Sequence, residues 1–432
     1  MIMAMMKSGN TEWLGDIPAE WYVAQIGNYY ELRNEKVSDY DFEPLSVTMK
    51  GIVTQLATAA KSDDHSNRKL VKKGDFVINS RSDRRGSCGI SPLDGSVSLI
   101  NTVMEPRGKI NPQYYNCLFH TEQFADEFYK WGHGIVDDLW TTRWQEMKKI
   151  LIVAPPLDEQ QSIANYLDET CSKIDEIIAE AKASIDEYKD LKQSVIFEAV
   201  TKGLDKNVGM KDSGIEWIGE IPSSWHLTKV RRIIEQSKNG IKFGPFGSAL
   251  TNKTSGEAPI YIYGQANLVA NDFSFAKNRI SEETYSTLSS YEVVPGDICL
   301  SMMGTIGKCH TVPENINKGI MDSHLIKIRL NDLMDNRYFE YVYDKDLSGI
   351  CFIQMQYDKK GSIMDGLNTS IVKGLILPLP TKQEQQIIVD YLDKEVPKID
   401  SLISEKESLI NDLEAYKKSL IYEVVTGKRR VV

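Results

Sequence analysis

The segment EWLGDIPAEW, residues 12–21, returns as EWIGEIPSSW at residues 216–225, and this repeat decides how the chain is organised. Six of the ten positions are identical, including both tryptophans, at an offset of 204 residues. Chance does not reproduce two tryptophans, a glycine and a proline at fixed spacing. The chain therefore contains an internal duplication.

A second group of short segments repeats further along the chain, at a larger offset. They are EQQ (159–161), YLD (166–168) and KID (173–175), which return 225 positions later at 384–386, 391–393 and 398–400. The change of offset means that the second intervening block is 21 residues longer than the first. A repeated frame around divergent blocks indicates two related domains with different contents.

The repeated distal segments are expected to be long helices. Each follows a proline cluster, and its apolar residues then alternate at intervals of four and three, which is typical of a coiled-coil seam. At about 1.5 Å per residue, a helix of about 45 residues would reach roughly 65 to 70 Å. Two matching stripes in one chain favour an antiparallel pair, with Leu191 and Tyr416 continuing the two seams. The residues expected to pair are Ile174, Ile178, Ile185, Tyr188, Ile399, Ile403, Ile410 and Leu413.

The intervening blocks predict a mixture of helices and strands. Runs bounded by glycine and turn residues predict strands at 75–78, 297–300 and 325–328. The expected fold class is α+β (mixed): two α/β domains separated by two long antiparallel coiled-coil helices, with a pseudo-twofold internal repeat. The predicted divisions are a first domain at 1–152 (repeat segment 8–26), a central helical spacer at 153–205, a second domain at 206–377 (repeat segment 212–230) and a C-terminal helix at 378–432.

The charge distribution leaves a nucleic-acid partner possible. The net charge is −10, which by itself argues against phosphate binding. However, residues 158–205 hold 12 acidic and 5 basic groups, whereas both intervening blocks are near neutral. The six cysteines form no zinc or disulfide pattern, and no apolar run is long enough to span a membrane. These features favour a reduced, cytoplasmic location without a membrane partner.

No catalytic or metal-binding sequence pattern is complete. The turn at 304–308 ends like a phosphate loop, but Met302 stands where the first glycine is needed and Cys309 stands where the Ser/Thr is needed. The segment NPQY at 111–114 is similar to the adenine-methyltransferase loop but lacks its second proline, so a plain turn is favoured. None of the six histidines has a metal-ligand spacing. We therefore expect no catalytic residues and no metal ligands.

Two loops in the divergent blocks suit contact with a polyanion, although an ordinary surface turn is the alternative for each. Residues 81–87 concentrate three arginines, whose guanidinium groups suit phosphate or guanine. Residues 242–248 offer backbone N–H groups, a hydroxyl and aromatic rings on a glycine-rich turn. With the 304–308 turn, the candidate DNA-contact residues are Arg81, Ser82, Arg84, Arg85, Lys242, Phe243, Gly244, Phe246, Gly247, Ser248, Gly304, Thr305 and Lys308.

These motifs together resemble the specificity subunits of type I restriction-modification systems over nearly the whole chain. The resemblance rests on the two tryptophan segments, the proline-to-EQQ joints, the paired helices, and the segments GPFGS (244–248) and GTIG (304–307). It implies two target recognition domains, each reading half of a bipartite, asymmetric DNA site, and two helices that dock methyltransferase subunits. The first block lacks a counterpart of GPFGS, so its contact residues are less well defined.

The resemblance also implies a division of labour among subunits. Double-stranded DNA, two methyltransferase subunits and a restriction/translocase subunit are the expected partners. S-adenosylmethionine, ATP and Mg are expected in those partner subunits, and no cofactor is expected in this chain. The alternatives are a self-contained DNA methyltransferase or nuclease with unrecognised motifs, and a coiled-coil scaffold that does not touch DNA.

Overall fold

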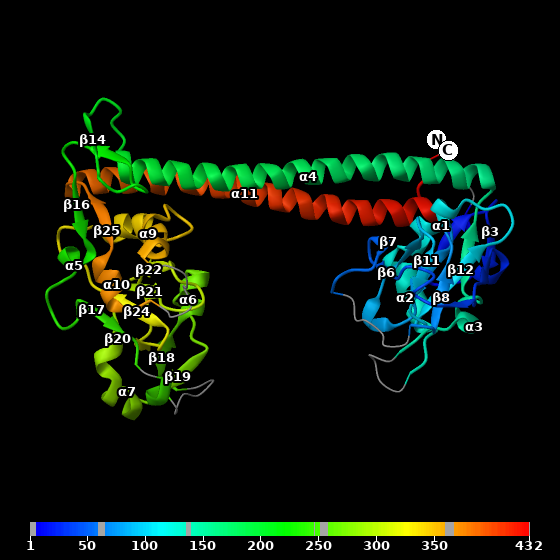
Figure 1. Cartoon of the computed structure of the whole chain (residues 1–432), viewed down its shortest axis with the longest axis horizontal. Coiled ribbons are helices and arrows are strands. Elements are labelled where there is room, and N and C mark those ends of the chain that lie inside the picture. The colour runs from blue at the N-terminus through cyan, green and yellow to red at the C-terminus, as the bar shows by residue number, and fades with distance from the viewer. Residues whose placement is uncertain are drawn as a thin grey trace. The chain divides into compact units, whose positions relative to one another are not determined.

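The computed structural model describes residues 6–58, 65–134, 140–245, 247–250, 258–358 and 367–431 (Figure 1). The chain forms two compact units. The first unit combines Met1–Lys182 with Ser408–Val432, and the second is the continuous segment Ala183–Glu407. Each unit therefore contains one divergent block together with parts of both long helices. The sequence predicts a division into four consecutive segments, whereas the two units are defined by contacts and share the long helices. The four-segment division stays a prediction.

The first unit is built on antiparallel sheets. The central sheet has the order β10-β9-β12-β4, and a second sheet has the order β11-β8-β5. The strands of these sheets are β4 (Tyr30–Leu32), β5 (Lys36–Val37), β8 (Arg68–Val71), β9 (Phe76–Asn79), β10 (Cys88–Ile90), β11 (Gly95–Val97) and β12 (Asn101–Pro106). Three antiparallel pairs complete the set: β1 (Met6–Ser8) with β2 (Asp16–Pro18), β3 (Tyr22–Gln25) with β13 (Leu151–Ala154), and β6 (Leu45–Thr48) with β7 (Gly51–Thr54).

Three short helices lie beside these sheets: α1 (Pro112–Phe119), α2 (Glu122–Lys130) and α3 (Trp144–Met147). The strand expected at 75–78 is confirmed as β9, whose four residues are all buried. Aromatic rings fill the core between β9 and α1: the ring of Phe119 lies 5.0 Å from that of Phe76 and 5.9 Å from that of Tyr30, centre to centre. The apolar run of β9 is explained by burial on both faces.

The second unit has two four-stranded sheets. One is wholly antiparallel, with the order β17-β24-β21-β22; the other, β19-β18-β23-β20, contains the parallel pair β18 and β23. Their strands are β17 (Ile241–Phe243), β18 (Ile260–Tyr263), β19 (Asn278–Ile280), β20 (Glu292–Val293), β21 (Ile298–Ser301), β22 (Cys309–Thr311), β23 (Gly319–Met321) and β24 (Leu325–Ile328). The strands expected at 297–300 and 325–328 are confirmed as β21 and β24. Two further antiparallel pairs are β14 (Met210–Asp212) with β15 (Glu220–Pro222) and β16 (His226–Lys229) with β25 (Ile376–Leu379).

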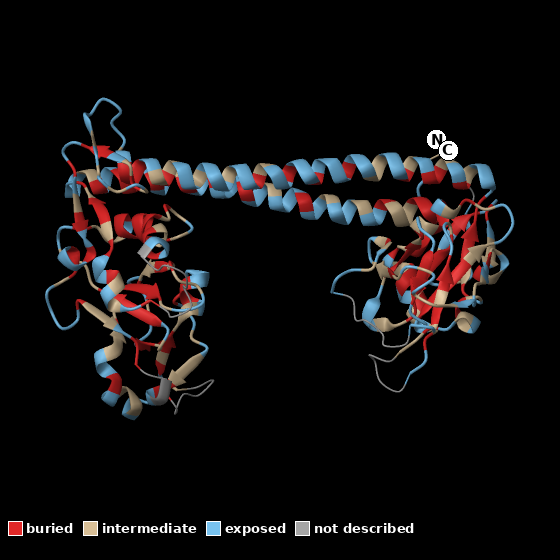
Figure 2. Ribbon diagram, in the orientation of Figure 1, coloured by how far each residue is buried: buried red, intermediate tan, exposed pale blue. Residues whose placement is uncertain are grey.

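The shorter helices of the second unit are α5 (Val230–Ile233), α6 (Gln265–Ala270), α7 (Glu282–Leu288), α8 (Asn336–Tyr343), α9 (Ile350–Asp358) and α10 (Thr369–Gly374). One large apolar core joins α8 and strands β21 and β24 to the end of α4 and the start of α11. The long helices are therefore part of the domain core. In both units, the buried residues gather in the sheets and on the helix faces against them (Figure 2).

The two long helices, α4 (Leu157–Lys202) and α11 (Lys382–Val425), pack antiparallel, as the sequence predicts (Figure 1). In the first unit Lys417 Nζ lies 2.6 Å from Asp175 Oδ2, and in the second unit Lys192 Nζ lies 2.7 Å from Asp400 Oδ1. The two lysines are 225 positions apart, and so are the two aspartates. The two ion pairs are therefore equivalent under the internal repeat, and they give both parts of the helix pair the same register.

The structure places most of the expected seam residues away from solvent. Ile174, Ile178, Ile185, Ile399, Ile403 and Ile410 are buried, and Tyr188 and Leu413 are half-buried. Leu191 and Tyr416, which were expected to continue the two seams, are instead 48% and 45% exposed. At the following positions, Lys192 and Lys417 turn towards the partner helix and form the two ion pairs. The 3.6-residue period of the helix drifts away from a strict seven-residue repeat, which accounts for this change.

The repeated tryptophans and glutamines fasten each block to the start of a long helix. Trp21 Nε1 donates to Glu159 Oε2 at 2.9 Å, and Trp225 Nε1 donates to Glu384 Oε1 at 3.1 Å. One residue further on, Gln160 Oε1 accepts the backbone N–H of Asn111, the N-cap residue of α1, at 2.9 Å. Gln385 Oε1 likewise accepts the N–H of Asp335, the N-cap residue of α8, at 2.7 Å. Burial raises the pKa of Glu384, but hydrogen bonds from Thr381 and Trp225 outweigh it and leave the pKa below its usual range.

A second joint connects each block to the end of the other long helix. Tyr114 Oη, on α1, donates to the Val425 carbonyl at 2.7 Å, and Tyr338 Oη, on α8, donates to the Val200 carbonyl at 3.1 Å. These carbonyls belong to the last turns of α11 and α4, where no intrahelical donor remains. The glycine after each helix, Gly203 or Gly427, has a positive φ. Each unit therefore binds the start of one long helix and the end of the other.

Candidate nucleic-acid interface

The arginine-rich turn of the first unit lies directly after β9. Ser82–Arg84 form a single 3-10 turn, which the Ser82 N–H anchors by donating to the Trp140 carbonyl at 3.1 Å. Arg84 is the most exposed of the three arginines, with 68% of its side chain accessible. An exposed arginine on a tight turn is well placed to reach a phosphate or a base edge.

Acidic neighbours partly neutralise this turn. Arg81 Nε lies 3.1 Å from Asp83 Oδ1, and Arg84 Nε lies 3.9 Å from the other oxygen of the same carboxylate. Arg85 pairs with Asp126 on α2. Any contact with a phosphate must compete with these ion pairs, so the turn is less strongly basic than its sequence indicates.

Gly244 is held by close contacts inside the second unit. The Gly244 N–H donates to the Leu325 carbonyl at 2.9 Å, so it is not available to an outside partner. A Cβ at this position would lie 1.7 Å from the Asp322 carbonyl oxygen, so only glycine fits here. Lys242 lies on β17 with its Nζ 4.4 Å from the centre of the Tyr291 ring, and Phe243 is exposed beside it.

The rest of this loop is only partly described. Phe246 lies outside the described residues, and Gly247 and Ser248 begin a 3-10 turn, Gly247–Leu250. Burial, and then the nearby Lys327, lowers the pKa of Lys242. Among the described side chains of this loop, those of Lys242 and Phe243 are placed where a partner could reach them.

The turn at Gly304–Lys308 is held mainly by internal contacts. Gly304 and Gly307 both have positive φ, and Thr305 Oγ1 lies 2.7 Å from Ser301 Oγ. Lys308 Nζ lies 3.3 Å from the buried Asp344 and 2.5 Å from Asp346. Burial lowers the pKa of Lys308, but the two carboxylates outweigh it and raise the pKa overall. The structure therefore uses Lys308 to neutralise a buried carboxylate.

A basic patch that the sequence reasoning missed lies on the second unit. Arg231 and Arg232 on α5, Lys238 and Lys373 are exposed and line one shallow groove of about 840 Å³. Across the described ranges, no ion pair involves any of these four side chains, whereas Glu235 in the same groove faces Arg329. The basic run Lys229–Arg232 in the sequence indicates part of this patch. The sequence does not indicate that Lys373, about 140 residues later, lies in the same groove.

The amide side chains around Asn111 form a structural cap. The Asn111 side chain accepts the Tyr114 N–H at the start of α1 and donates to Gln161 Oε1 at 2.8 Å. The NPQY segment is thus a helix-capping turn, as the sequence favoured, and not a base-binding loop. Among the described residues, no group of three His, Cys, Asp or Glu side chains is arranged to hold a metal ion.

Comparisons with known proteins agree with this architecture. Residues 241–412 match the family model of the type I restriction modification DNA specificity domain. The type I restriction enzyme MjaVIII specificity subunit of Methanocaldococcus jannaschii is 24% identical over 96% of this chain and 94% of its own length.

The chain is thus similar to type I specificity subunits over nearly its whole length. Among solved structures, the fold is similar to a chain from a study of complex assembly and conformational transition of the type I R-M system, with a TM-score of 0.71 at 13% identity, covering 96% of this chain and 99% of that one. It is also similar to the HsdS subunit of Thermoanaerobacter tengcongensis, with a TM-score of 0.53 at 16% identity, covering 96% and 98%.

The family match covers most of the second divergent block but leaves out Arg231, Arg232 and Lys238 of the basic patch. It begins at Ile241, includes Lys242, Gly244 and Lys308, and ends within α11. The helices that the structure describes include none long and apolar enough to cross a membrane.

Proposed function

We propose that this chain supplies the DNA specificity of a type I restriction-modification complex, with each unit reading one half of a bipartite DNA site. The observation that carries the proposal is the repeated fastening of two different blocks to one helix pair. Trp21 and Trp225, and likewise Tyr114 and Tyr338, make equivalent joints, while the surfaces between the joints differ.

The differences between the blocks favour an asymmetric site. The first unit presents the Arg84 turn, whereas the second presents Lys242, Phe243 and the basic patch of Arg231 and Arg232. Base readout depends on which side chains reach the groove edges, so two dissimilar surfaces recognise two dissimilar half-sites.

The helix pair is proposed as the docking surface for two methyltransferase subunits. Leu402, Leu409 and Tyr416 recur every seven residues along α11 and are all exposed. Ile177 and Leu191 of α4, which correspond to Leu402 and Tyr416 in the internal repeat, are exposed as well. Exposed apolar rows bordered by charged side chains are typical of protein interfaces. A restriction/translocase subunit is expected to join through this assembly.

We assign no catalysis to this chain. Methyl transfer, with S-adenosylmethionine, and ATP- and Mg-dependent translocation and cleavage are assigned to partner subunits. The direct test is to assay the purified chain for methyl transfer and cleavage, alone and after assembly. Activity of the isolated chain would contradict this part of the proposal and favour a self-contained enzyme.

The experiment that tests the two-reader proposal is an exchange of blocks. Residues 22–152 would be replaced by the corresponding block of another specificity subunit, and the assembled complex would be used to methylate genomic DNA. Mapping the methylated bases should show one half-site changed and the other preserved. If both half-sites change together, the two units do not read DNA separately.

A further inference from the structure

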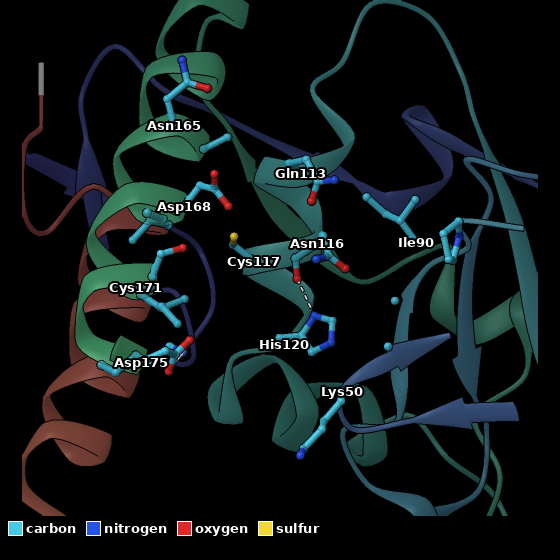
Figure 3. Close-up of a pocket in the computed structure, with 18 of the residues that line it drawn as sticks. Lys50, Ile90, Gln113, Asn116, Cys117, His120, Asn165, Asp168, Cys171 and Asp175 are labelled. Carbon is cyan, nitrogen blue, oxygen red and sulfur yellow. Dashed lines mark hydrogen bonds and ion pairs between the residues drawn. The ribbon is translucent and has the colours of Figure 1, made fainter. Parts of the chain in front are cut away.

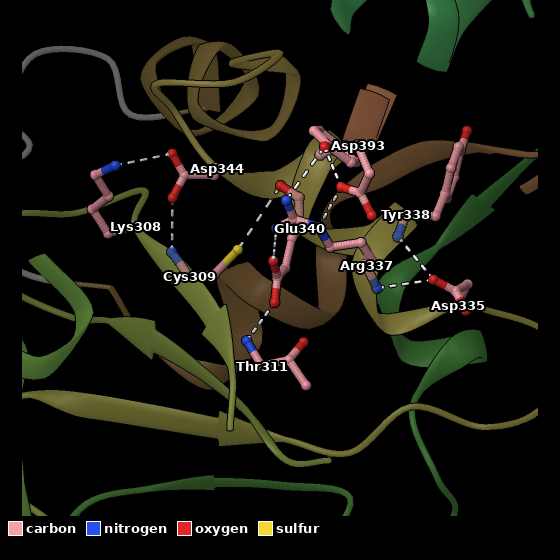
Figure 4. A network of polar contacts seen from close by, with 10 residues as sticks. Lys308, Cys309, Thr311, Asp335, Arg337, Tyr338, Glu340, Asp344 and Asp393 are labelled. Carbon is pink, nitrogen blue, oxygen red and sulfur yellow. Dashed lines mark hydrogen bonds and ion pairs between the residues drawn. The ribbon is translucent and has the colours of Figure 1, made fainter. Parts of the chain in front are cut away.

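In the second unit, an arginine links α8 to the start of α11 (Figure 4). Arg337 Nε lies 3.0 Å from Asp393 Oδ1 on α11, and Arg337 Nη1 lies 2.6 Å from Glu340 Oε2. Tyr341 Oη donates to the same Asp393 oxygen at 2.6 Å, and the guanidinium group lies 4.7 Å from the centre of the Tyr341 ring. One guanidinium group therefore bridges two carboxylates, one on each helix.

The charges of this network support one another. Burial lowers the pKa of Arg337, but the carboxylate of Glu340 and then that of Asp393 outweigh it, so the pKa is raised overall. Burial and the hydrogen bond to Asp393 raise the pKa of Tyr341. Asp393 is thereby kept paired although its side chain is 45% exposed.

The first unit repeats this geometry position by position. Asn111 caps α1 as Asp335 caps α8, and Tyr114 corresponds to Tyr338 in the bond to the end of a long helix. Counting from these shared points, Gln113, Asn116 and Cys117 stand where the second unit has Arg337, Glu340 and Tyr341, and Asp168 on α4 stands where it has Asp393.

In the first unit the two acceptors remain and their donors are missing. Asn116 Oδ1 is buried without a hydrogen-bond partner. Across the described part of the chain, the carboxylate of Asp168 makes no hydrogen bond or ion pair, and neither does the side chain of Gln113. A buried amide oxygen without a donor costs about 1–3 kcal/mol relative to a bonded one. The site is therefore incomplete in the isolated chain.

In the first unit, a groove opens beside the residues equivalent to Arg337 and Tyr341 (Figure 3). The groove has a volume of about 790 Å³ and is lined by α1, α4, the turn between β6 and β7, β10 and α11. Two lysines, Lys50 and Lys417, also line it, and Lys417 is paired with Asp175. Gln113, Asn116, Cys117, His120, Asp168 and Cys171 are among its lining residues, and Figure 3 shows these side chains around the opening.

We propose that this groove is a guanidinium-binding site that receives an arginine side chain from a partner protein. The planar guanidinium group can donate to Asp168 and, once the Asn116 side chain turns its Oδ1 towards the groove, to Asn116 as well, as Arg337 does to Asp393 and Glu340. The ammonium group of lysine lacks this fork geometry. The site itself follows from the internal repeat alone. The assignment of the occupant to a subunit of the assembly rests on the proposed function.

The site is tested on the full chain with acetyl-arginine amide as the probe and acetyl-citrulline amide as its uncharged counterpart. Isothermal titration should detect the arginine derivative and not the citrulline derivative. Asp168→Asn should weaken binding at least about tenfold, as expected for the loss of one charge-assisted contact. The matched control is Asp190→Asn, which changes an exposed carboxylate of α4 outside the groove and should leave binding unchanged.

Two further variants use the repeat itself. Gln113→Arg gives the first unit its own guanidinium group and should abolish binding of the probe, while Arg337→Gln should open a second site in the other unit. Equal binding of the two amides, or unchanged binding in Asp168→Asn, would overturn the site.

The source of the arginine is tested separately, in the complex assembled with methyltransferase subunits. If a partner arginine occupies the groove, the probe should no longer bind, and Asp168→Asn should weaken assembly while Asp190→Asn does not. Unchanged probe binding in the complex would overturn the partner assignment. It would leave the titration on the isolated chain, and the block-exchange test of DNA recognition, unaffected.

Discussion

Replacing Tyr338 by phenylalanine removes one oxygen atom from the joint between α8 and the end of α4. Tyr338 is fully buried, and its hydroxyl donates to the Val200 carbonyl at 3.1 Å. Without the hydroxyl, that carbonyl has no donor, because it lies in the last turn of α4. A buried acceptor left unsatisfied costs about 1–3 kcal/mol. For a unit of this size, such a loss corresponds to a fall in Tm of roughly 2 to 12 °C.

The same helix provides the control. Tyr343 is also fully buried, but its hydroxyl has no hydrogen-bond partner, so Tyr343→Phe leaves no polar atom newly unsatisfied. Thermal unfolding followed by circular dichroism and calorimetry should show a lower Tm for Tyr338→Phe and an unchanged or higher Tm for Tyr343→Phe. In the first unit, Tyr114→Phe and Tyr115→Phe form the equivalent pair. Equal losses in both members of a pair would refute the assignment of the hydroxyl as a cap for the helix end.

Three other predictions concern charge and docking. Arg231→Ala should weaken DNA binding by the assembled complex and reduce the slope of log K against log salt by about one, whereas Lys308→Ala should mainly lower the Tm of the second unit, because Asp344 loses its cation. The lowered pKa of Glu384 stabilises the fold above the usual pKa of 4.5, and this contribution is lost as the pH falls through the lower pKa of the folded state. Glu384→Gln should therefore make the free energy of unfolding depend less on pH in the acid range, as measured by denaturant unfolding at a series of pH values. An unchanged pH profile would count against this assignment. Leu409→Glu should weaken association with methyltransferase subunits, measured by sedimentation, without changing the Tm of the isolated chain.

The sequence predicts the parts of this fold that the repeat makes visible. The repeat locates the tryptophan segments, the glutamine joints and both long helices. It does so because equivalent residues make the same hydrogen bonds in both halves. Strands β9, β21 and β24 can also be located, because each is an apolar run that ends at a turn. What the repeat does not carry is the geometry of the loops between these marks.

The candidate contact residues show why the site is harder to predict than the fold. Lys308 was expected to be available to DNA, but its ion-pair partners Asp344 and Asp346 come from a later segment that folding brings beside it. Gly244 was expected to expose its N–H group, but the sheet uses that group and packs closely against it. Long-range contacts of this kind leave no periodic signal in the sequence, so they become visible only in three dimensions.

The fastening of each block to the end of the other long helix has a consequence for the order in which the protein is made. The second unit is one continuous segment, Ala183–Glu407, and all of it has been synthesised before residue 408 is added. The first unit includes Ser408–Val432. Two of its hydrogen bonds, from Tyr114 to the Val425 carbonyl and from Tyr422 to the Trp13 carbonyl, can form only after these last residues have been synthesised. The first divergent block therefore leaves the ribosome first, but the unit that contains it is completed last. A chain truncated near its C-terminus should keep the second unit folded and lose the first.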